Sequence, residues 1–526
     1  MAVTTTKGIN KVIFSSSLGT LIEWYDFYIF GMLAKTISVQ FFPEGNDTAA
    51  LLSTLAIFAA GFLVRPFGAL VFGRLGDLIG RKYTFLLTLV LMGGSTFLIG
   101  LVPGYKTIGI AAPLLVLLLR LIQGLALGGE YGGAATYVAE HAPEGRRGYF
   151  TAWIQTTATL GLFVALGVIM VVKGNMSDAS FNAEWGGWRY PFWISILLVV
   201  VSIYIRMRMN ESPAFAKLKA EKKTSVNPLK ESFGNRSNFK MVLLALFGAV
   251  MGQGVIWYTG QLYAQSFLEN AVKIEFMQNR EILLWGIALA TPFFVFFGWL
   301  SDQFGRKWIM LTGMLLGVVF YRPIFRTFLK DADAKVWMGK LEELHPNKKL
   351  SFADKDFLLK NDTVKTNDGT ILFIRQVKSI YTYGGNQFAK TFTDTTQVKA
   401  DCMLKVISTQ VSAPVYSDKI LSTALKWKFI FLVWTMIFFV TMVYGPVAAF
   451  LVELFPTKIR YTSMSLPYHI GNGVFGGLVP FIATLLSTTF TSDPLVGLWY
   501  PIGVAALCFV IGTLYLTNKV DKSIHD

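Results

Sequence analysis

Long apolar stretches constrain the fold of this chain more than any other feature of its sequence. Twelve of them run for roughly 18 to 30 residues, and a helix needs about 20 residues to cross a bilayer. The strands of a transmembrane β-barrel would instead be short and alternating. The sequence therefore predicts twelve transmembrane helices, near residues 12–37, 49–72, 83–102, 109–138, 149–172, 190–207, 241–267, 282–300, 308–328, 428–453, 461–488 and 495–517.

The composition agrees with a membrane protein. Hydrophobic residues make up 53% of the 526 residues and charged residues only 15%, against about 25% in soluble proteins. A soluble globule of this size would have too little charge to keep its exterior solvated, which disfavours soluble, disordered and fibrous proteins. The two cysteines, Cys402 and Cys508, are too few and too isolated for a disulfide framework or a metal site.

The net charge of +16 would suggest a nucleic-acid partner in a soluble protein. Here the cations gather in alternate short loops, after the second, fourth, sixth, eighth and tenth helices. Lys and Arg are enriched in cytoplasmic loops, so we expect both termini in the cytoplasm of a multi-pass protein of a bacterial-type inner membrane. The excess of Lys and Arg over Asp and Glu is therefore explained by the orientation of the chain in the lipid bilayer and not by nucleic-acid binding.

A polar segment, 329–427, interrupts the pattern between the ninth and tenth helices. The same topology places this insert outside the cytoplasm. Helix-forming residues at 331–344, an Asp368-Gly369 turn, and β-branched or aromatic runs up to Tyr383 and over 398–411 predict a small α/β domain. We expect it to cover the outer vestibule or to recruit a partner. The predicted organisation is a first six-helix half (1–208), a cytoplasmic loop (209–239), helices seven to nine (240–328), the insert, and helices ten to twelve with a tail (428–526).

One ten-residue pattern, here called the gate motif, occurs twice: Gly73-Arg-Leu-Gly-Asp-Leu-Ile-Gly-Arg-Lys82 and Gly298-Trp-Leu-Ser-Asp-Gln-Phe-Gly-Arg-Lys307. The copies follow the second and the eighth helix, which predicts two six-helix halves in parallel orientation with a substrate site between them at mid-depth. The Asp can accept hydrogen bonds from a helix N-terminus, and the Arg can pair with a carboxylate. We expect a cytoplasmic gate made of Gly73, Asp77, Gly80, Arg81, Gly298, Asp302, Gly305 and Arg306.

The gate motif resembles the signature loop of the major facilitator superfamily. Further strings resemble its sugar-transporter-like branch of metabolite:proton symporters: Gly19-Thr-Leu-Ile-Glu-Trp-Tyr-Asp-Phe-Tyr28, Arg65-Pro-Phe-Gly68, Arg120-Leu-Ile-Gln-Gly124, Gly128-Gly-Glu-Tyr-Gly-Gly133, Trp188-Arg-Tyr-Pro-Phe192 and Glu453-Leu-Phe-Pro-Thr-Lys-Ile-Arg-Tyr461. The resemblance covers nearly the whole chain except 329–427, where the family has a short loop. It implies solute uptake coupled to proton entry, with the proton as coupling ion and no other cofactor. Members of this branch carry dicarboxylates, tricarboxylates, shikimate-like acids, or proline and betaine.

Ionisable residues inside the predicted helices are candidates for function, because a charge in a bilayer is costly. Glu23 and Asp26 lie three residues apart on the first helix and share a face, and Arg120 of the fourth helix lies at a similar depth near the midplane. A carboxyl group beside an arginine favours its ionised form, whereas one alone in apolar surroundings keeps its proton. Alternation between these states would couple protons to transport; a static pair that orients two helices is the alternative.

Two other charged residues also have structural alternatives. Glu130 of the fourth helix is either functional or a buried acid bonded to another helix or to Arg147. Small residues at every fourth position of that helix predict close packing (Gly124, Gly128 and Gly132). Arg65, toward the inner end of the second helix, suits a gate or a snorkelling role better than substrate contact.

The second half offers polar groups at mid-depth. A polar and aromatic stripe on the seventh helix suits a solute pocket, although ordinary interhelical hydrogen bonding would use the same residues (Gln253, Trp257 and Gln261, with Tyr258 and Tyr263 nearby). His469 and Asn472 lie three residues apart on the eleventh helix. Histidine titrates near neutral pH, so His469 is either a functional group or a satisfied structural residue.

The sequence has no Walker loop, HExxH or GxSxG pattern, so we expect no enzyme activity, no metal and no ATP-driven step. It predicts an all-α, twelve-helix secondary transporter, with a small organic acid or zwitterion and protons as its solutes. The alternative is a membrane sensor that binds a ligand on the insert without transporting it.

Overall fold

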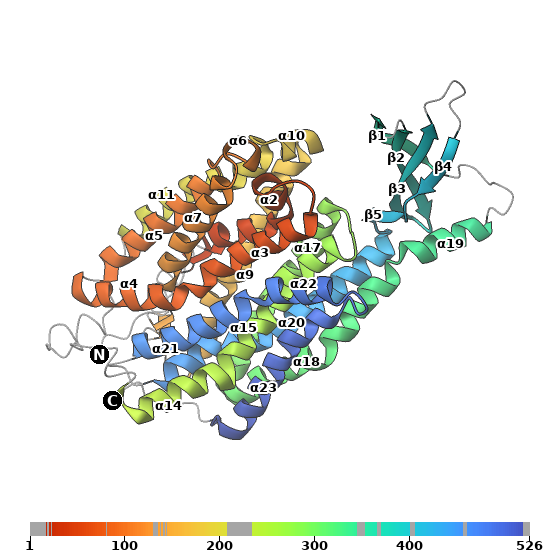
Figure 1. The fold of residues 1–526 in the computed structure, drawn as a ribbon. Coiled ribbons are helices and arrows are strands. Elements are labelled where there is room, and N and C mark those ends of the chain that lie inside the picture. Colours follow the sequence, from red (N-terminus) through yellow and green to blue (C-terminus); the bar gives the residue numbers. More distant parts are fainter. Residues whose placement is uncertain are drawn as a thin grey trace. The chain divides into compact units, whose positions relative to one another are not determined.

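The computed structural model describes residues 17, 20–22, 24–79, 81–129, 135–136, 138–139, 142–143, 145–207, 234–344, 353–365, 370–399, 406–455 and 460–518. Ten helical stretches in this part are long and apolar enough to cross a membrane. Two further predicted spans contain α5 (Arg81–Ile99) and the helical residues 20–22 and 24–32. Each of the twelve apolar stretches therefore contains helix, which confirms the all-α membrane fold (Figure 1).

The helices of the first half are α2 (Ala34–Phe41), α3 (Asp47–Leu63), α4 (Arg65–Ile79), α5, α6 (Tyr105–Ile108), α7 (Ala111–Gly128), α9 (Arg147–Gly174), α10 (Asp178–Asn182), the short η1 (Gly187–Arg189) and α11 (Tyr190–Met207). Those of the second half are α14 (Arg236–Ala245), η2 (Leu246–Val250), α15 (Met251–Tyr258), η3 (Thr259–Tyr263), α16 (Ala264–Asn270), α17 (Phe276–Phe304), α18 (Arg306–Asp331), α19 (Ala334–Leu344), α20 (Thr423–Leu454), α21 (Arg460–Tyr468), η4 (His469–Gly476), α22 (Val479–Thr489), η5 (Val496–Leu498) and α23 (Trp499–Tyr515).

Chain contacts divide the protein into two compact units. The first contains the described residues of Met1–Ala264, Leu284–Pro323 and Val433–Asp526, and so holds the membrane-spanning core of both halves. The second contains Gln265–Leu283 and Ile324–Leu432, including the insert.

Glycine allows α7 to pack directly on α3 and α4 in the first unit. A Cβ atom on Gly124 would lie 1.8 Å from the carbonyl oxygen of Gly61, and one on Gly128 would lie 2.1 Å from that of Arg65. Only hydrogen fits at these places, so the predicted close packing of Gly124 and Gly128 is confirmed. Gly132 lies outside the described residues.

Three segments of the second half have π-helical hydrogen bonding: η2, η3 and η4. Such wide turns are rare in helices and often occur at functional sites. The first two flank α15 within the seventh spanning helix, and the third lies within the eleventh. They surround or contain the polar residues predicted at mid-depth, Gln253, Gln261, His469 and Asn472.

The insert is a small α/β domain, as predicted. Its strands are β1 (Lys355–Lys365), β2 (Thr370–Tyr383), β3 (Asn386–Lys399), β4 (Val406–Val411) and β5 (Val415–Ile420). They form one antiparallel sheet in the order β1-β2-β3-β4, with β5 also paired to β3. Helix α19 lies against the sheet (Figure 1), where Trp337 contacts the buried Phe388 at a ring distance of 5.8 Å.

Two details of the insert differ from the sequence prediction. The run 398–411 divides between two strands, since β3 ends at Lys399 and β4 begins at Val406. Strand β1 is too polar to have been predicted from hydrophobicity. The hairpin between β2 and β3 turns at Gly384 and Gly385, whose positive φ angles (57° and 78°) suit a two-residue loop. The predicted Asp368-Gly369 turn lies outside the described residues.

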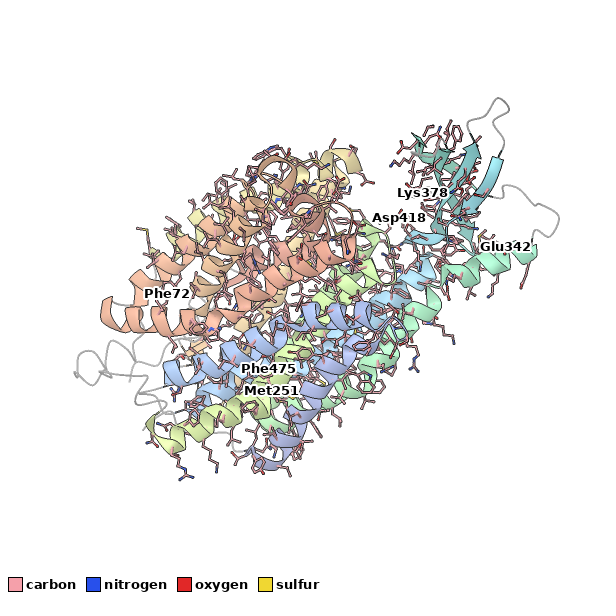
Figure 2. The ribbon with its side chains drawn as sticks, viewed as in Figure 1. Phe72, Met251, Glu342, Lys378, Asp418 and Phe475 are labelled. Carbon is pink, nitrogen blue, oxygen red and sulfur yellow. The ribbon has the colours of Figure 1, made fainter. Side chains whose placement is uncertain are left out.

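Within the second unit, backbone and side-chain bonds attach β5 to the connection between α16 and α17. Lys419 exchanges backbone hydrogen bonds with Lys273 (3.0 Å) and Glu275 (2.9 Å). The amide of Gln278 donates to the Leu421 carbonyl at 3.0 Å and accepts from its N–H at 2.6 Å. On the sheet itself, Lys378 of β2 pairs with Asp418 of β5 at 2.6 Å (Figure 2). The insert is therefore attached to the connection between α16 and α17, in addition to its covalent links to α18 and α20.

Candidate functional site

Aromatic rings from both halves of the chain meet in the interior of the first unit. Trp24 stacks on Tyr28 with ring centroids 5.0 Å apart, and Tyr28 stacks on Trp257 of α15 at 5.3 Å. Phe62 of α3 meets Tyr258 of α15 edge-to-face at 5.1 Å. The first helix and α3 thus contact the seventh spanning helix, at the place where the gate-motif repeat predicts a solute site.

Two arginines are buried beside this aromatic cluster. Arg65 is 1% exposed, and its guanidinium lies over the rings of Phe62 (4.1 Å) and Phe27 (4.4 Å). Arg120 is fully buried, and its guanidinium lies over Phe27 (4.3 Å) and Phe30 (4.7 Å). Phe27 therefore contacts both cations. The burial of Arg65 shows that it does not snorkel to the membrane interface, whereas its role in a gate stays a prediction.

Arg120 does not pair with the carboxyl group of Asp26 in this structure. Arg120 donates to the side-chain oxygen of Gln123 and, at 3.4 Å, to the carbonyl of Phe58. Gln123 donates in turn to the carbonyl of Asp26 at 3.1 Å and to the hydroxyl of Thr96 at 2.7 Å. Arg120 thus reaches the main chain of Asp26 through an amide, while the carboxyl group points elsewhere.

The carboxyl group of Asp26 points toward α5, where Oδ2 lies 3.2 Å from the place that a Cβ atom on Gly93 would take. The residue is 1% exposed, and Oδ1 has no hydrogen-bond partner. Sequence spacing gives the depth of Asp26 but not the helix rotation that decides which neighbour it faces. Glu23 and Glu130 lie outside the described residues.

The predicted polar groups of the second half are all buried, and two of them contact each other. Gln253 of α15 donates to Asn472 of η4 at 3.3 Å. Both side-chain atoms of Gln261, the Oε1 atom of Gln253 and the indole N–H of Trp257 are buried without hydrogen-bond partners. His469 is 1% exposed and meets Tyr468 edge-to-face at 5.5 Å. Unpaired buried amide and indole groups can bind a polar solute or water.

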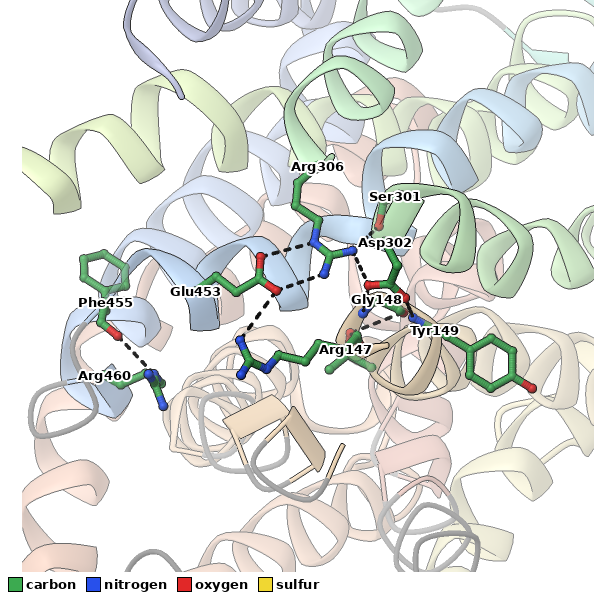
Figure 3. Close-up of polar contacts among 10 residues, drawn as sticks. Arg147, Gly148, Tyr149, Ser301, Asp302, Arg306, Glu453, Phe455 and Arg460 are labelled. Carbon is green, nitrogen blue, oxygen red and sulfur yellow. Dashed lines mark hydrogen bonds and ion pairs between the residues drawn. The ribbon is translucent and has the colours of Figure 1, made fainter. Parts of the chain in front are cut away.

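A second cluster, here called the gate cluster, consists of Arg147, Gly148, Asp302, Arg306 and Glu453 (Figure 3). Asp302 accepts hydrogen bonds from the backbone N–H groups of Gly148 and Tyr149, both at 2.8 Å. These groups belong to the first turn of α9, which has unpaired N–H groups and a positive dipole end. The second gate motif thus binds a helix N-terminus of the first half, as its Asp suggests.

Glu453 of α20 completes the gate cluster. Arg306 pairs with Glu453 at 2.9 Å and with Asp302 at 2.6 Å, and Arg147 lies 3.9 Å from Glu453. The prediction missed Glu453 and Arg147 as gate residues. A second repeat could have identified them: Glu140-His-Ala-Pro-Glu-Gly-Arg-Arg147 and Glu453-Leu-Phe-Pro-Thr-Lys-Ile-Arg460 share Glu, Pro and Arg in register.

Glycine brings the two halves into backbone contact at this cluster. A Cβ atom on Gly148 would lie 2.3 Å from the carbonyl oxygen of Gly298, and one on Gly298 would lie 2.6 Å from that of Gly148. Gly305 has φ of +90°, which favours glycine at the turn between α17 and α18. Nearby, Lys307 donates to two carbonyls at the C-terminal end of α23, that of Thr513 (2.8 Å) and that of the capping residue Leu516 (2.7 Å).

The first copy of the gate motif is described only by its backbone. Gly73 and Asp77 lie on α4 and Arg81 begins α5, but their side chains and all of Gly80 lie outside what is described. The described residues contain no group of three or more His, Cys, Asp or Glu side chains that could hold a metal ion.

Known proteins are similar to this chain in sequence and in fold. The family model "Sugar (and other) transporter" matches residues 12–236. The inner membrane metabolite transport protein YhjE of Escherichia coli K12 is 32% identical over 486 residues, which cover 91% of this chain and 88% of that protein. The alpha-ketoglutarate permease of the same organism is 38% identical over 312 residues, 59% of this chain and 70% of the permease.

The fold agrees with these relatives. A partially occluded, inward-open structure of the xylose transporter XylE from E. coli superimposes with a TM-score of 0.62 at 14% identity, covering 98% of this chain and 100% of that one. The relatives are transport proteins by name, which disfavours a non-transporting sensor. The chain is a multi-pass membrane transporter and belongs to the sugar-transporter-like metabolite transporters of the major facilitator superfamily.

Proposed function

We propose that this transporter is a proton-coupled symporter that imports a small organic acid or zwitterionic metabolite by alternating access. The observation that supports this most directly is the environment of Asp26. Its carboxyl group is 1% exposed, one oxygen has no hydrogen-bond partner, and no cation of the described residues pairs with it. A carboxyl group in such surroundings is stable as the neutral acid.

Arg120 is the group that would release this proton. It is fully buried, and Gln123 links it to the main chain of Asp26. A rotation of the first helix that brings the carboxyl group to the guanidinium would favour the ionised form. Alternation between the separated and the paired arrangement would load and release one proton per cycle.

Related transporters support the solute class. A proline/betaine transporter of E. coli K12 is 34% identical over 346 residues, and a shikimate transporter of the same organism is 31% identical over 332 residues. These names cover zwitterions and organic acids. The unpaired groups of Gln253, Gln261 and Trp257 would hydrogen-bond the polar parts of either kind of solute.

Transport assays with Asp26→Asn test the coupling. In proteoliposomes, the variant should lose accumulation driven by a pH gradient while it keeps exchange of labelled for unlabelled solute, since exchange moves no net proton. Asp47→Asn, at an exposed position at the start of α3, is the matched control and should accumulate solute normally. Full accumulation by Asp26→Asn would contradict the proposal.

We also propose that both termini and the gate cluster face the cytoplasm and that the insert faces outward, as the distribution of Lys and Arg in the loops suggests. Protease added to intact cells should then cut within the insert. Cleavage in inverted vesicles alone would reverse this orientation.

A further inference from the structure

We propose that the transported solute is a net anion, a carboxylate without a fixed positive charge, and that Arg65 and Arg120 supply its counter-charge. This inference rests on the proposed transport function and narrows its solute class. It assigns Arg65 a contact with solute, in place of the gate role that its position in the sequence suggests.

The first argument is the balance of charge in the described core. Arg65 and Arg120 are 1% and 0% exposed, and neither has a carboxylate of the described residues within 4 Å. The Nε and Nη2 atoms of Arg65 and the Nε atom of Arg120 have no hydrogen-bond partner. Among the described residues, Asp26 is an acid of this region, and its carboxyl group points toward Gly93 of α5. Among the described residues, these two buried guanidinium groups have no ionic partner.

The second argument is that the present neighbours of the two arginines do not neutralise them. Arg120 has Gln123 and the Phe58 carbonyl as acceptors, together with aromatic rings. Arg65 has the rings of Phe27 and Phe62. These groups are neutral. A buried cation is best stabilised by a charged acceptor, and a guanidinium binds a carboxylate with two parallel hydrogen bonds.

The third argument concerns the other end of the solute. A quaternary or primary ammonium group is usually held by open aromatic faces or by a carboxylate. Here the faces of Trp24, Tyr28 and Trp257 stack on one another, with interplanar angles of 16° and 21°. Among the described residues, the unpaired polar groups that α15 and η3 contribute are neutral: the amides of Gln253 and Gln261 and the indole N–H of Trp257. These groups suit hydroxyl, carbonyl or carboxyl oxygens and provide no counter-charge for an ammonium group.

Binding of a defined panel of solutes tests the proposal. Purified full-length protein in nanodiscs is titrated calorimetrically with acetate, succinate and citrate, and with glycine betaine and proline. At least one of the carboxylates should bind, and the two zwitterions should not. Binding of a zwitterion with no binding of any carboxylate would overturn the inference. Uptake driven by a pH gradient, measured in parallel, separates the two proposals: zwitterion uptake coupled to protons would leave the proposed function intact, and absence of any coupled uptake would refute that function itself.

Arginine variants test the assignment of the two residues. Arg65→Gln and Arg120→Gln should each weaken binding of the carboxylate by roughly 10- to 100-fold, the loss expected for a hydrogen bond to a charged group. Arg65→Lys and Arg120→Lys keep the charge, so they should recover part of the affinity and also serve if the Gln variants do not fold. Arg326→Gln, at an exposed position on α18, is the control with unchanged affinity. Unchanged affinity in folded Gln or Lys variants of both arginines would overturn the assignment.

Discussion

The amine of Lys419 is buried in the second unit, outside the membrane-spanning segments. The residue is 7% exposed, and its Nζ donates to the Ala332 carbonyl at 2.6 Å. Burial lowers its pKa to about 8, with Asp333 opposing the shift and Lys273 adding to it. In an unfolded segment the amine would titrate near 10.4. Between these two values the open form binds more protons, so local stability should rise as pH rises from about 8 to about 10.

Hydrogen exchange measures this effect directly. In the full-length protein, opening of β5 should be rarer at pH 9.5 than at pH 7.5, after correction for the intrinsic exchange rate. Lys419→Met removes the titrating group and should abolish this dependence. An identical pH slope in the wild-type and Met proteins would show that Lys419 does not control the opening.

At single residues, the sequence predicts burial and depth better than it predicts contacts. Asp26 and Arg120 are both in the core, but they do not pair, because helix rotation separates their side chains. Asp302 and Arg306 were predictable, since their repeated motif specifies a backbone turn and its two charged partners. Glu453 was recognisable only through the second internal repeat, in which residues 140–147 match residues 453–460.

Among the helices, the close approach of α7 to α3 gives a testable packing constraint. Gly124→Ala would place a methyl group 1.8 Å from the Gly61 carbonyl, so the helices must separate. We expect destabilisation of about 1–3 kcal/mol, the usual cost of overpacking. Thermal unfolding in detergent should show a clearly lower midpoint. Gly167→Ala is the matched control, because nothing lies within 4 Å of the added methyl group.

At the level of elements, periodic patterns explain what was predictable. Glycines at every fourth position revealed the packing face of α7, and aromatic or β-branched runs revealed β2. The π-helical segments η3 and η4 depend on backbone hydrogen bonds shifted by one residue, which side-chain patterns do not encode. Strand β1 is recognisable through its pairing with β2 rather than through its own polar sequence.

On the scale of the whole molecule, the gate cluster is the contact that a rocking motion of the two halves would break. Asp302→Asn removes the charge that binds the first turn of α9 and the Arg306 guanidinium. Hydrogen bonds to charged groups contribute about 1.5–3 kcal/mol. The population with the cluster open should therefore rise roughly tenfold or more.

Cysteine accessibility reports that population. Ala152→Cys, in a background without Cys402 and Cys508, is placed on α9 against Gly298, where Ala152 is fully buried. Maleimide labelling of this cysteine should be faster when Asp302→Asn is added. Asp362→Asn in the insert serves as the control. Equal labelling rates in the presence and absence of Asp302→Asn would contradict a role for the cluster in closing the protein.

The contact between Gly148 and Gly298 determines how abruptly such a gate responds. A side chain can change rotamer and keep touching its partner while two helices drift apart by an ångström or more. Two glycine backbones have no side chains that could bridge a widening gap. Their van der Waals contact and the neighbouring hydrogen bonds of Asp302 are therefore lost together within a small displacement. The free energy of separation should therefore rise steeply over a short distance and then level off. Such a profile favours two discrete states, closed and open, over a continuum of partly open ones.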